Sequence, residues 1–423
     1  MKKLFALATC SLLVVGLSGC NKNKGETIDL VYSGTASDKD FNTQLFEDFK
    51  AARKAAGDNN TYNIEYIEHG PDKVDSEIQD WTTGPDVFEF ASDKITDLYA
   101  KGALSKLSST QSKWVKDNNS TLGANLAKFN KETYAYPYTG DNTYYFQYDK
   151  SIITNPEDAK SVEKILEIAE KGGYKFGYNL KEAFWGGAAM FTFGADYSMT
   201  FDADGSVKTV EADFDGANGL KAAKGIQKII KSTAWSNDMA APTPENKFIG
   251  CIAGTWDIAS YKSALGDNYA CAPMPTVTVD GETKNLGAFL GGKLLGVNST
   301  RSSGNETRTA AAHELAKFLS GKECQLKRFE NGKITPCNKE AANDPTVLAD
   351  ENVKVLIEHA AYAHEQTAVP GTFWSAPGTF VTSLTDGTVK DNDNDTTLKA
   401  ALTTMNNAIK SAANKEDDTD NNK

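Results

Sequence analysis

Residues 28–32 (IDLVY), 62–67 (YNIEYI) and 87–90 (VFEF) are three short runs typical of β-strands, and together they decide the fold class. Between the first two, residues 41–56 carry apolar side chains near the helical period, which predicts a helix. A shorter helix is expected at 74–81, before the turn Gly84-Pro85-Asp86. This alternation of strand and helix predicts an α/β fold with a largely parallel sheet.

The carboxyl ends of such strands are where a ligand site is expected. Asp93 directly follows the run 87–90 and therefore lies at such an end. The loop 34–40 (GTASDKD) follows the first strand and should face the same cleft, with Asp38 or Lys39 as its candidate contact.

The rest of the chain continues the alternation over roughly 380 residues, a length that suits two domains. We expect a hairpin over 199–210 that turns at Asp202-Ala203-Asp204-Gly205. The Pro/Gly-rich stretch 370–378 is not expected to be helical. The remaining expected elements are helices at 161–171, 219–232, 309–319, 353–364 and 396–412, and buried strands at 248–253 and 269–274.

The N-terminus predicts export. Met1-Lys2-Lys3 precedes an apolar run of 13 residues, Leu4 to Gly16, and then Leu17-Ser18-Gly19-Cys20. The run is shorter than the ~20 residues of a membrane-spanning helix. The small residues before Cys20 resemble a bacterial lipobox, which implies a signal peptide over 1–19, a lipid on Cys20 and a polar tether over 20–26. An ordinary signal peptide with an incidental Cys20 is the alternative.

Composition and charge limit the classes of partner and cofactor that this chain is expected to bind. The formal net charge of −12 becomes −14 once Lys2 and Lys3 leave with the leader, and this disfavours nucleic acid as a partner. Residues 411–423 form an acidic tail expected to be disordered. No cofactor or metal motif is present, and the Asp391–Asp395 run lacks the glycine and glutamate of an EF-hand loop. Apart from Cys20, the mature chain has four cysteines, which are expected to be buried thiols or two local pairs, 251–271 and 324–337.

Several blocks, in the same order along the chain, resemble the extracytoplasmic maltose/maltodextrin-binding proteins of bacterial sugar importers. They are Gly84-Pro85-Asp86 with Phe90, Ala91 and Asp93; Ala135-Tyr136-Pro137 with Asp141, Tyr148 and Lys150; residues 179–184 (NLKEAF); Gly254-Thr255-Trp256; residues 269–275, 287–298 and 314–319 (ELAKFL); and Phe373-Trp374.

The resemblance implies a two-lobed, periplasmic-binding-protein-like fold. Each lobe would be a mainly parallel sheet flanked by helices, with the ligand cleft between the lobes. The N-terminal lobe would comprise 27–138 plus 292–338, and the C-terminal lobe 142–288 plus 342–410, with crossovers near 138–142, 288–296 and 335–342. The implied protein is a monomeric lipoprotein on the outer face of the cytoplasmic membrane, or the periplasmic face in a Gram-negative cell. It would deliver an oligosaccharide, maltodextrin first among the candidates, to the permease of an ABC importer.

A sugar ring offers flat C–H faces and an edge of hydroxyls, so its site needs aromatic plates and fixed polar groups. By resemblance the plates are Phe90, Phe184, Trp256 and Trp374, with Trp185 the alternative to Phe184. The edge groups are Asp93, Lys94, Asp141 and Glu182. Each role has a competing interpretation. Phe90 and Trp256 could instead pack in a core. Asp141 could only cap a strand, and Lys94 could be a solvated surface lysine.

Three other functions remain open from the sequence. A glycosidase needs two carboxylates at a set spacing, which Asp93, Asp141 or Glu182 could supply, but nothing marks an acid/base pair. Gly-x-Ser-x-Gly and His-Glu-x-x-His motifs do not occur, so an enzyme is not predicted. The other two are a protein of the same fold that binds another solute, and a surface adhesin.

Cys20 provides the first test. A Cys20→Ala protein should fold and bind ligand as before but disappear from the membrane fraction, because the lipid is its only predicted anchor. Fractionation followed by immunoblotting measures this, and a Cys20→Ala protein retained on membranes would contradict the prediction.

Overall fold

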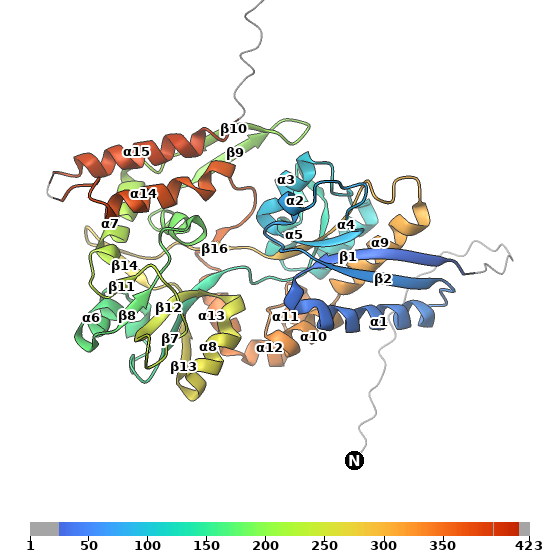
Figure 1. Ribbon diagram of the computed structural model, residues 1–423, viewed down its shortest axis with the longest axis horizontal. Helices are drawn as coiled ribbons and strands as arrows, with labels where there is room; N and C mark the ends of the chain where they lie inside the picture. Colours follow the sequence, from blue (N-terminus) through green and yellow to red (C-terminus); the bar gives the residue numbers. More distant parts are fainter. Residues whose placement is uncertain (1–24, 392, 414–423) are drawn as a thin grey trace, which may run out of the picture.

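A computed structural model describes residues 25–391 and 393–413, and it contains two α/β lobes side by side (Figure 1). Each lobe has its own hydrophobic core. One core draws on residues 28–138 together with 294–324, and the other on residues 144–289 together with 373–409. The α/β, two-lobed fold class is thereby confirmed, while the domain limits set out above stay a prediction. Cys20, most of the tether and most of the acidic tail lie outside the described residues.

The N-terminal lobe is built on a five-stranded sheet. Its spatial order is β2 (Thr61–Glu68), β1 (Thr27–Gly34), β3 (Val87–Ala91), β17 (Lys293–Val297) and β6 (Ala135–Pro137). Strand β1 is parallel to β2 and β3, whereas β17 is antiparallel to β3 and β6.

The C-terminal lobe repeats this arrangement. Its sheet runs in the order β11 (Trp235–Ser236), β8 (Lys175–Gly177), β12 (Phe248–Gly254), β7 (Tyr144–Asp149) and β13 (Tyr269–Ala272). Strand β8 is parallel to β11 and β12, whereas β7 is antiparallel to β12 and β13.

Each sheet is therefore mixed but mainly parallel, because four of its five strands run in one direction and only β17 or β7 opposes them, which confirms the expectation. The antiparallel strand in each sheet is the one that enters from the other lobe. Strand β17 starts at Lys293, opposite Ala91 at the carboxyl end of β3, and β7 starts at Tyr144, opposite Gly254 at the carboxyl end of β12. A chain that enters a lobe at its cleft edge can only run away from that edge, and so against the strands that end there.

Helices cover the faces of both sheets (Figure 1). Those on the N-terminal side are α1 (Lys39–Ala55), α2 (Val74–Glu77), α3 (Ile95–Ala100), α4 (Ser109–Asn118), α5 (Thr121–Leu126), α9 (Glu306–Leu319), α10 (Lys322–Gly332) and α11 (Lys339–Ala342). Those that lead to and cover the other lobe are α6 (Val162–Gly172), α7 (Ala217–Ile230), α8 (Ile258–Leu265), α12 (Pro345–Ala349), α13 (Glu351–His359), α14 (Ala376–Thr385) and α15 (Thr396–Lys410). Within the described residues, no helix combines the length and apolar character needed to cross a membrane.

The predicted helices and strands are found near their expected ends, with two corrections. The helix expected over 353–364 ends at His359, and His364 belongs to β18 (His364–Glu365). The second correction concerns α14. The stretch 370–378 is helical: a 3-10 turn, η7 (Gly371–Trp374), leads into α14. Pro377 lies in the first turn of α14, where the N–H that proline lacks would have no partner inside the helix.

Short strand pairs complete the molecule. They are β9 (Tyr197–Phe201) with β10 (Val207–Ala212), which is the predicted hairpin; β14 (Thr276–Val279) with β15 (Glu282–Asn285); β4 (Lys128–Phe129) with β5 (Glu132–Thr133); and β16 (Phe289–Leu290) with β18 (His364–Glu365).

The lobes are joined by segments that hydrogen-bond to one another. Asn142 in the first crossover and Gly291 in the second exchange backbone hydrogen bonds of 3.2 and 2.9 Å. In the third, the Thr335 N–H donates to Asp141 at 2.7 Å. A fourth segment was not predicted: after α13 the chain returns to the hinge, where β18 pairs in parallel with β16.

All four cysteines in the described part of the chain are free thiols, so the local pairs 251–271 and 324–337 are wrong. Cys251 and Cys271 lie on opposite sides of β7, and both are in register with Gln147. Two strand spacings separate them by about 9–10 Å, which exceeds the reach of a disulfide.

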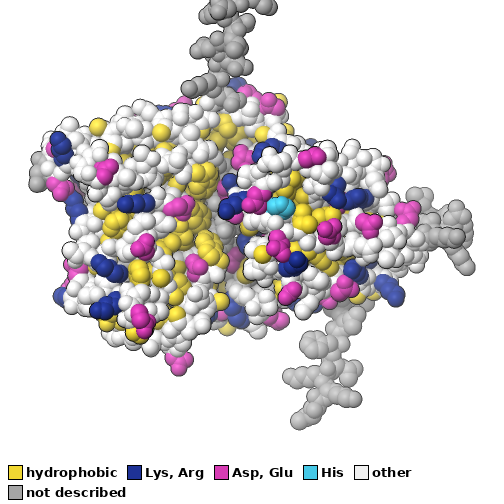
Figure 2. All heavy atoms as spheres, in the orientation of Figure 1, with side chains coloured by type: hydrophobic (Ala, Val, Ile, Leu, Met, Phe, Trp, Pro, Cys, Tyr) yellow, Lys and Arg dark blue, Asp and Glu magenta, His cyan; other side chains and the backbone are white. Residues whose placement is uncertain are grey.

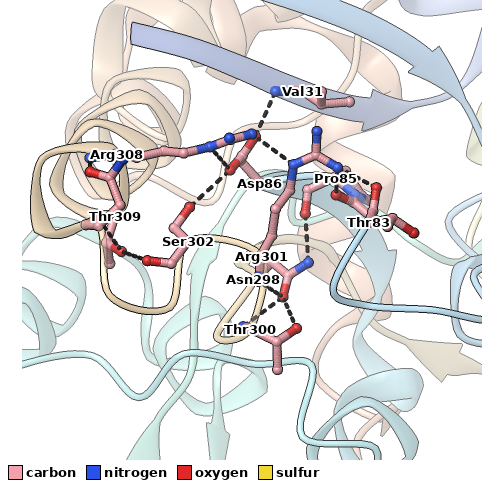
Figure 3. Close-up of polar contacts among 12 residues, drawn as sticks. Val31, Thr83, Pro85, Asp86, Asn298, Thr300, Arg301, Ser302, Arg308 and Thr309 are labelled. Atoms are coloured by element: carbon pink, nitrogen blue, oxygen red, sulfur yellow. Dashed lines mark hydrogen bonds and ion pairs between the residues drawn. The ribbon is translucent and has the colours of Figure 1, made fainter.

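Asp86 ties the N-terminal lobe together (Figure 3). Its fully buried carboxylate accepts hydrogen bonds from the Val31 N–H at 2.8 Å and from Ser302 at 3.0 Å. Arg308 of α9 donates to both carboxylate oxygens, at 2.7 and 2.8 Å. Arg301 lies 3.4 Å away and also donates to the Thr83 and Gly84 carbonyls. Asp86, expected in a sugar-contact segment, instead fixes the start of β3.

Asp86→Ala should lower the free energy of unfolding by about 3–5 kcal/mol, because it removes the carboxylate that compensates the charges of Arg301 and Arg308. Urea denaturation followed by circular dichroism measures this. Asp267→Ala is the control: this aspartate is exposed and its side chain makes no hydrogen bond or ion pair with the described residues, so the value should change by less than ~0.5 kcal/mol. A loss below ~1 kcal/mol for Asp86→Ala would contradict the assignment.

Candidate functional site

The cleft between the lobes holds a cavity of about 930 Å³. Seven of the eight residues proposed from the sequence line it: Asp93, Lys94, Asp141, Glu182, Phe184, Trp256 and Trp374. The space-filling view shows hydrophobic side chains gathered on the wall formed by the C-terminal lobe and charged side chains on the facing rim (Figure 2). The two walls therefore differ in chemistry.

The C-terminal wall is aromatic. Phe184, Trp185 and Trp256 form a cluster in which each ring centroid lies within 6.1 Å of the other two. Trp374 is also on this wall, with its ring 5.9 Å from buried Phe289. Because Phe184 and Trp185 both line the cavity, the choice between them that the sequence posed does not arise.

A single π-helical turn, η4 (Ala183–Gly187), places these two neighbours side by side. Such turns insert an extra residue into a helical path and are frequent at functional sites. Glu182 begins the turn, and its carboxylate accepts a hydrogen bond from the Phe184 N–H at 3.2 Å. The turn needs glycine at 186, because a Cβ there would lie 1.9 Å from the Leu180 carbonyl oxygen.

Trp256 is the most accessible aromatic of the site. It lies in the 3-10 turn η5 (Thr255–Asp257), directly after β12, and 55% of its surface is exposed. Thr255 anchors the turn to the first crossover by donating from its hydroxyl to the Asp141 carbonyl at 2.6 Å. The exposed indole of Trp256 inside the cleft can therefore serve as a stacking surface.

The N-terminal wall is charged. Asp38, Asp72, Asp93 and Lys94 all line the cavity from loops or turns that follow strands of that sheet. The loop 34–40 faces the cleft as expected, through Asp38, whereas Lys39 points to Glu68 in an exposed ion pair of 3.0 Å. The rule that side chains after strand ends meet at one edge thus held for this lobe.

Asp93 is nearly buried at the cleft floor. The amide of Gln366 donates to its Oδ1 at 2.9 Å, and the Lys94 ammonium lies 4.0 Å from its Oδ2. Burial raises the pKa of Asp93 to about 6, although Lys94 opposes that rise. The carboxylate is therefore shielded from solvent and only partly compensated by its protein partners.

Asp141 is buried like Asp93, whereas Glu182 is exposed on the cavity wall and only partly shielded from water. Burial raises the pKa of Asp141, even though the Thr335 N–H and the charge of Lys293 favour its ionised form. Burial also raises the pKa of Glu182, against the hydrogen bond from the Phe184 N–H. Three carboxylates from three different segments thus meet the cavity with unused acceptor capacity.

Phe90 is the one candidate that the structure places elsewhere. It has no exposed surface and packs in the N-terminal core, 5.8 Å from the ring of Phe88. Its predicted role as a plate is corrected to a core role. Strand β3 is buried on both faces, so alternation along it could not reveal which side chain turns to the cleft.

Sequence reasoning missed several residues of the cavity wall, among them Asp72, Asn142, Lys293 and Gln366. Asp72 follows β2 at the same sheet edge as Asp93, so the strand-end rule could have found it. Lys293 follows Gly291-Gly292 at the second crossover, and this glycine pair is only weak sequence evidence for a cavity residue. No sequence feature predicted Gln366, because it reaches the site through the fourth interlobe segment.

The described residues contain no group of three or more His, Cys, Asp or Glu side chains placed to hold a metal. Neither a histidine nor a cysteine lines the cavity in this part of the chain. The site offers ring faces and hydrogen-bond acceptors, which are means of binding.

A sequence profile described as bacterial extracellular solute-binding protein matches residues 44–355. This chain belongs to that family. As an extracellular solute-binding protein it acts outside the cytoplasm, which agrees with the predicted export.

Relatives of this solute-binding protein share its fold at low identity. A galactooligosaccharide-binding protein of Bacillus subtilis (strain 168) is 25% identical over 301 residues, 68% of either chain. The structure of a maltodextrin-binding protein from L. casei BL23, solved without ligand, superposes with a TM-score of 0.76 at 20% identity, covering 89% of this chain and 98% of that one. The GacH receptor of Streptomyces glaucescens, solved unliganded and with acarbose, gives 0.71 at 18% identity, covering 92% and 98%.

The raised pKa of Asp93 predicts how its substitution changes the stability of this binding protein with pH. Its pKa in the folded state, about 6, exceeds the ~3.9 of an unfolded chain, so the ionised carboxylate costs stability as pH rises through 6. Asp93→Asn removes this cost and keeps an acceptor for Gln366. The variant should be more stable than the parent at pH 8, by up to about 3 kcal/mol, and no more stable at pH 4. Urea denaturation at the two pH values measures this, and an equal difference at both would contradict it.

Proposed function

We propose that this protein is the substrate-capturing lipoprotein of an ABC importer and that it binds a neutral oligosaccharide in the interlobe cleft, maltodextrin being the leading candidate. The observation that carries the proposal is the pairing of an aromatic wall with a wall of carboxylates across one cavity. Family membership supports the class of function, and the names of the relatives just described support the class of ligand.

The aromatic wall suits sugar faces. Phe184, Trp185, Trp256 and Trp374 spread over several turns of the C-terminal lobe, so more than one ring can stack at once. Stacking removes apolar surface from water at about 25 cal/mol per Å², and needs no charge on the ligand.

The carboxylates suit sugar edges. An ionised carboxylate accepts two hydroxyl hydrogens at once, and hydrogen bonds to charged groups contribute about 1.5–3 kcal/mol each. Asp38, Asp72, Asp93, Asp141 and Glu182 would repel an anionic ligand, which disfavours sugar phosphates and acidic peptides. A micromolar affinity, about −8 kcal/mol, needs only a few such bonds and stacked rings after the costs of binding.

Placement of the two walls on different lobes gives the cleft a way to respond to ligand. A sugar laid on the C-terminal wall would draw the N-terminal carboxylates onto its hydroxyls, and rotation about the crossovers would close the cleft. Closure changes the outer surface that a permease can meet, while the lipid on Cys20 would keep the protein beside that permease.

A galactooligosaccharide is the second candidate ligand. It is favoured by the curated relative that carries this name and by a site whose chemistry suits any neutral, hydroxyl-rich chain. Ring faces differ little between the two sugars, so the positions of the acceptors decide between them.

A thermal-shift screen tests the proposal, since a ligand that binds only the folded state raises the melting temperature. Maltotriose, maltotetraose, a galactooligosaccharide, glucose and a sugar phosphate make an informative panel. A neutral oligosaccharide should raise the melting temperature and the sugar phosphate should not. Failure of every sugar to do so would reject the sugar assignment.

Trp256→Ala should weaken binding of the best sugar at least ten-fold in calorimetry, about 1.4 kcal/mol, because it removes a stacking face. Trp256→Phe, which keeps an aromatic face, is the matched control and should lose less. Because Trp256 is exposed, neither variant should alter the far-ultraviolet circular dichroism spectrum.

A further inference from the structure

Gln366 occupies a unique place in the hinge. It follows β18 on the fourth interlobe segment, is only 3% exposed, and lines the cavity. Its backbone N–H donates to the Leu290 carbonyl at 2.9 Å, and its carbonyl accepts from the Ser92 hydroxyl at 2.6 Å. The main chain at this residue therefore joins the second crossover to the cleft end of β3.

Its side-chain amide makes two more contacts with other segments. The oxygen accepts from the Asn142 amide at 2.7 Å, and the nitrogen donates to Asp93 Oδ1 at 2.9 Å. An ionised Asp93 carboxylate can only accept, so the Gln366 amide turns its nitrogen toward Asp93 and its oxygen toward Asn142.

We propose that Gln366 is a positioning residue for the ligand site: it holds Asp93 so that Oδ2 faces the cavity as a ligand acceptor, and it links that orientation to the packing of the crossovers. The inference rests on the proposed sugar site and deepens it, since it specifies which carboxylate oxygen meets the ligand. Oδ1 is already used by the amide, so Oδ2 is the oxygen left for a hydroxyl.

Within the described residues, the Gln366 amide is the side chain that donates a hydrogen bond to the Asp93 carboxylate, while the Lys94 ammonium lies 4.0 Å from its Oδ2. The other titratable groups facing it are Lys94 beside it, Asp75 of α2, Asp97 of α3 and Tyr197 of β9. Lys94 also lies 3.9 Å from Asp75, so its charge is shared. The Tyr197 hydroxyl donates to the Ala368 carbonyl at 3.3 Å and is thus engaged elsewhere.

Gln366→Glu is the sharpest test, because it changes one donor into a carboxyl of the same shape. Two carboxyl groups at this distance share a proton, and a protonated Glu can still donate to Asp93. With the best sugar of the panel, such as maltotetraose, the variant should bind within about three-fold of the parent at pH 5 and at least ten-fold more weakly at pH 8. Gln44→Glu on the exposed face of α1 controls for the added charge and should match the parent at both pH values.

A loss of affinity equal at pH 5 and pH 8 would overturn the proposal, because damage to packing alone does not depend on a shared proton. Gln366→Met provides a second test, which requires no sugar. Loss of the donated hydrogen bond should move the carbon-13 titration midpoint of the Asp93 carboxyl to higher pH. An unchanged midpoint would also overturn the proposal.

The unmodified protein offers a measurement that needs no variant to fold. The Gln366 side-chain N–H resonances should titrate with the Asp93 carboxyl in the ligand-free protein, and their failure to do so would reject the contact. Absence of binding to every sugar would instead reject the proposed function, so the two failures can be told apart.

Discussion

The hydrogen-bonded junction between the lobes is the constraint on which the rest of the structure depends. Asn142 and Gly291 pair their backbones, and Thr335 and Gln366 bind to the same junction from two later segments. Because the chain must pass there each time it changes lobe, β7 and β17 start at the cleft edge and run antiparallel to their neighbours. The mixed sheets follow from that entry point, and so does the gathering of cavity residues around it.

This junction also explains why the cleft floor can contain buried polar groups. Asp93 and Asp141 are acids whose burial raises their pKa, which is a cost to folding, yet each accepts a hydrogen bond from an interlobe segment. A ligand hydroxyl would supply the missing partner. Residues that lower the stability of the folded protein are expected where function is selected over stability.

Local patterns predicted the elements well and the side-chain directions less well. Strand-end placement pointed to Asp93 and the loop with Asp38, and the resemblance to maltodextrin-binding proteins pointed to Trp256 and Phe184, all of which line the cavity. Phe90 was misplaced because β3 is buried on both faces. The stretch at Trp374 was expected to be irregular because its Pro and Gly content hid a helix start, where proline is tolerated. The predicted pair of Cys251 and Cys271 failed because these two residues lie on opposite sides of β7.

The sequence by itself determined the α/β class, the helices and strands, the family, and the aromatic and acidic character of the site. These follow from periodicity, turn chemistry and motif order, all of which are local or sequential. Only the tertiary structure decided that the aromatic side chains lie on the wall opposite Asp38, Asp72 and Asp93, that Asp86 fixes the N-terminal lobe, and that Gln366 binds Asp93. The physical reason is distance along the chain: Gln366 and Asp93 are 273 residues apart, and only the interlobe junction brings their side chains to 2.9 Å.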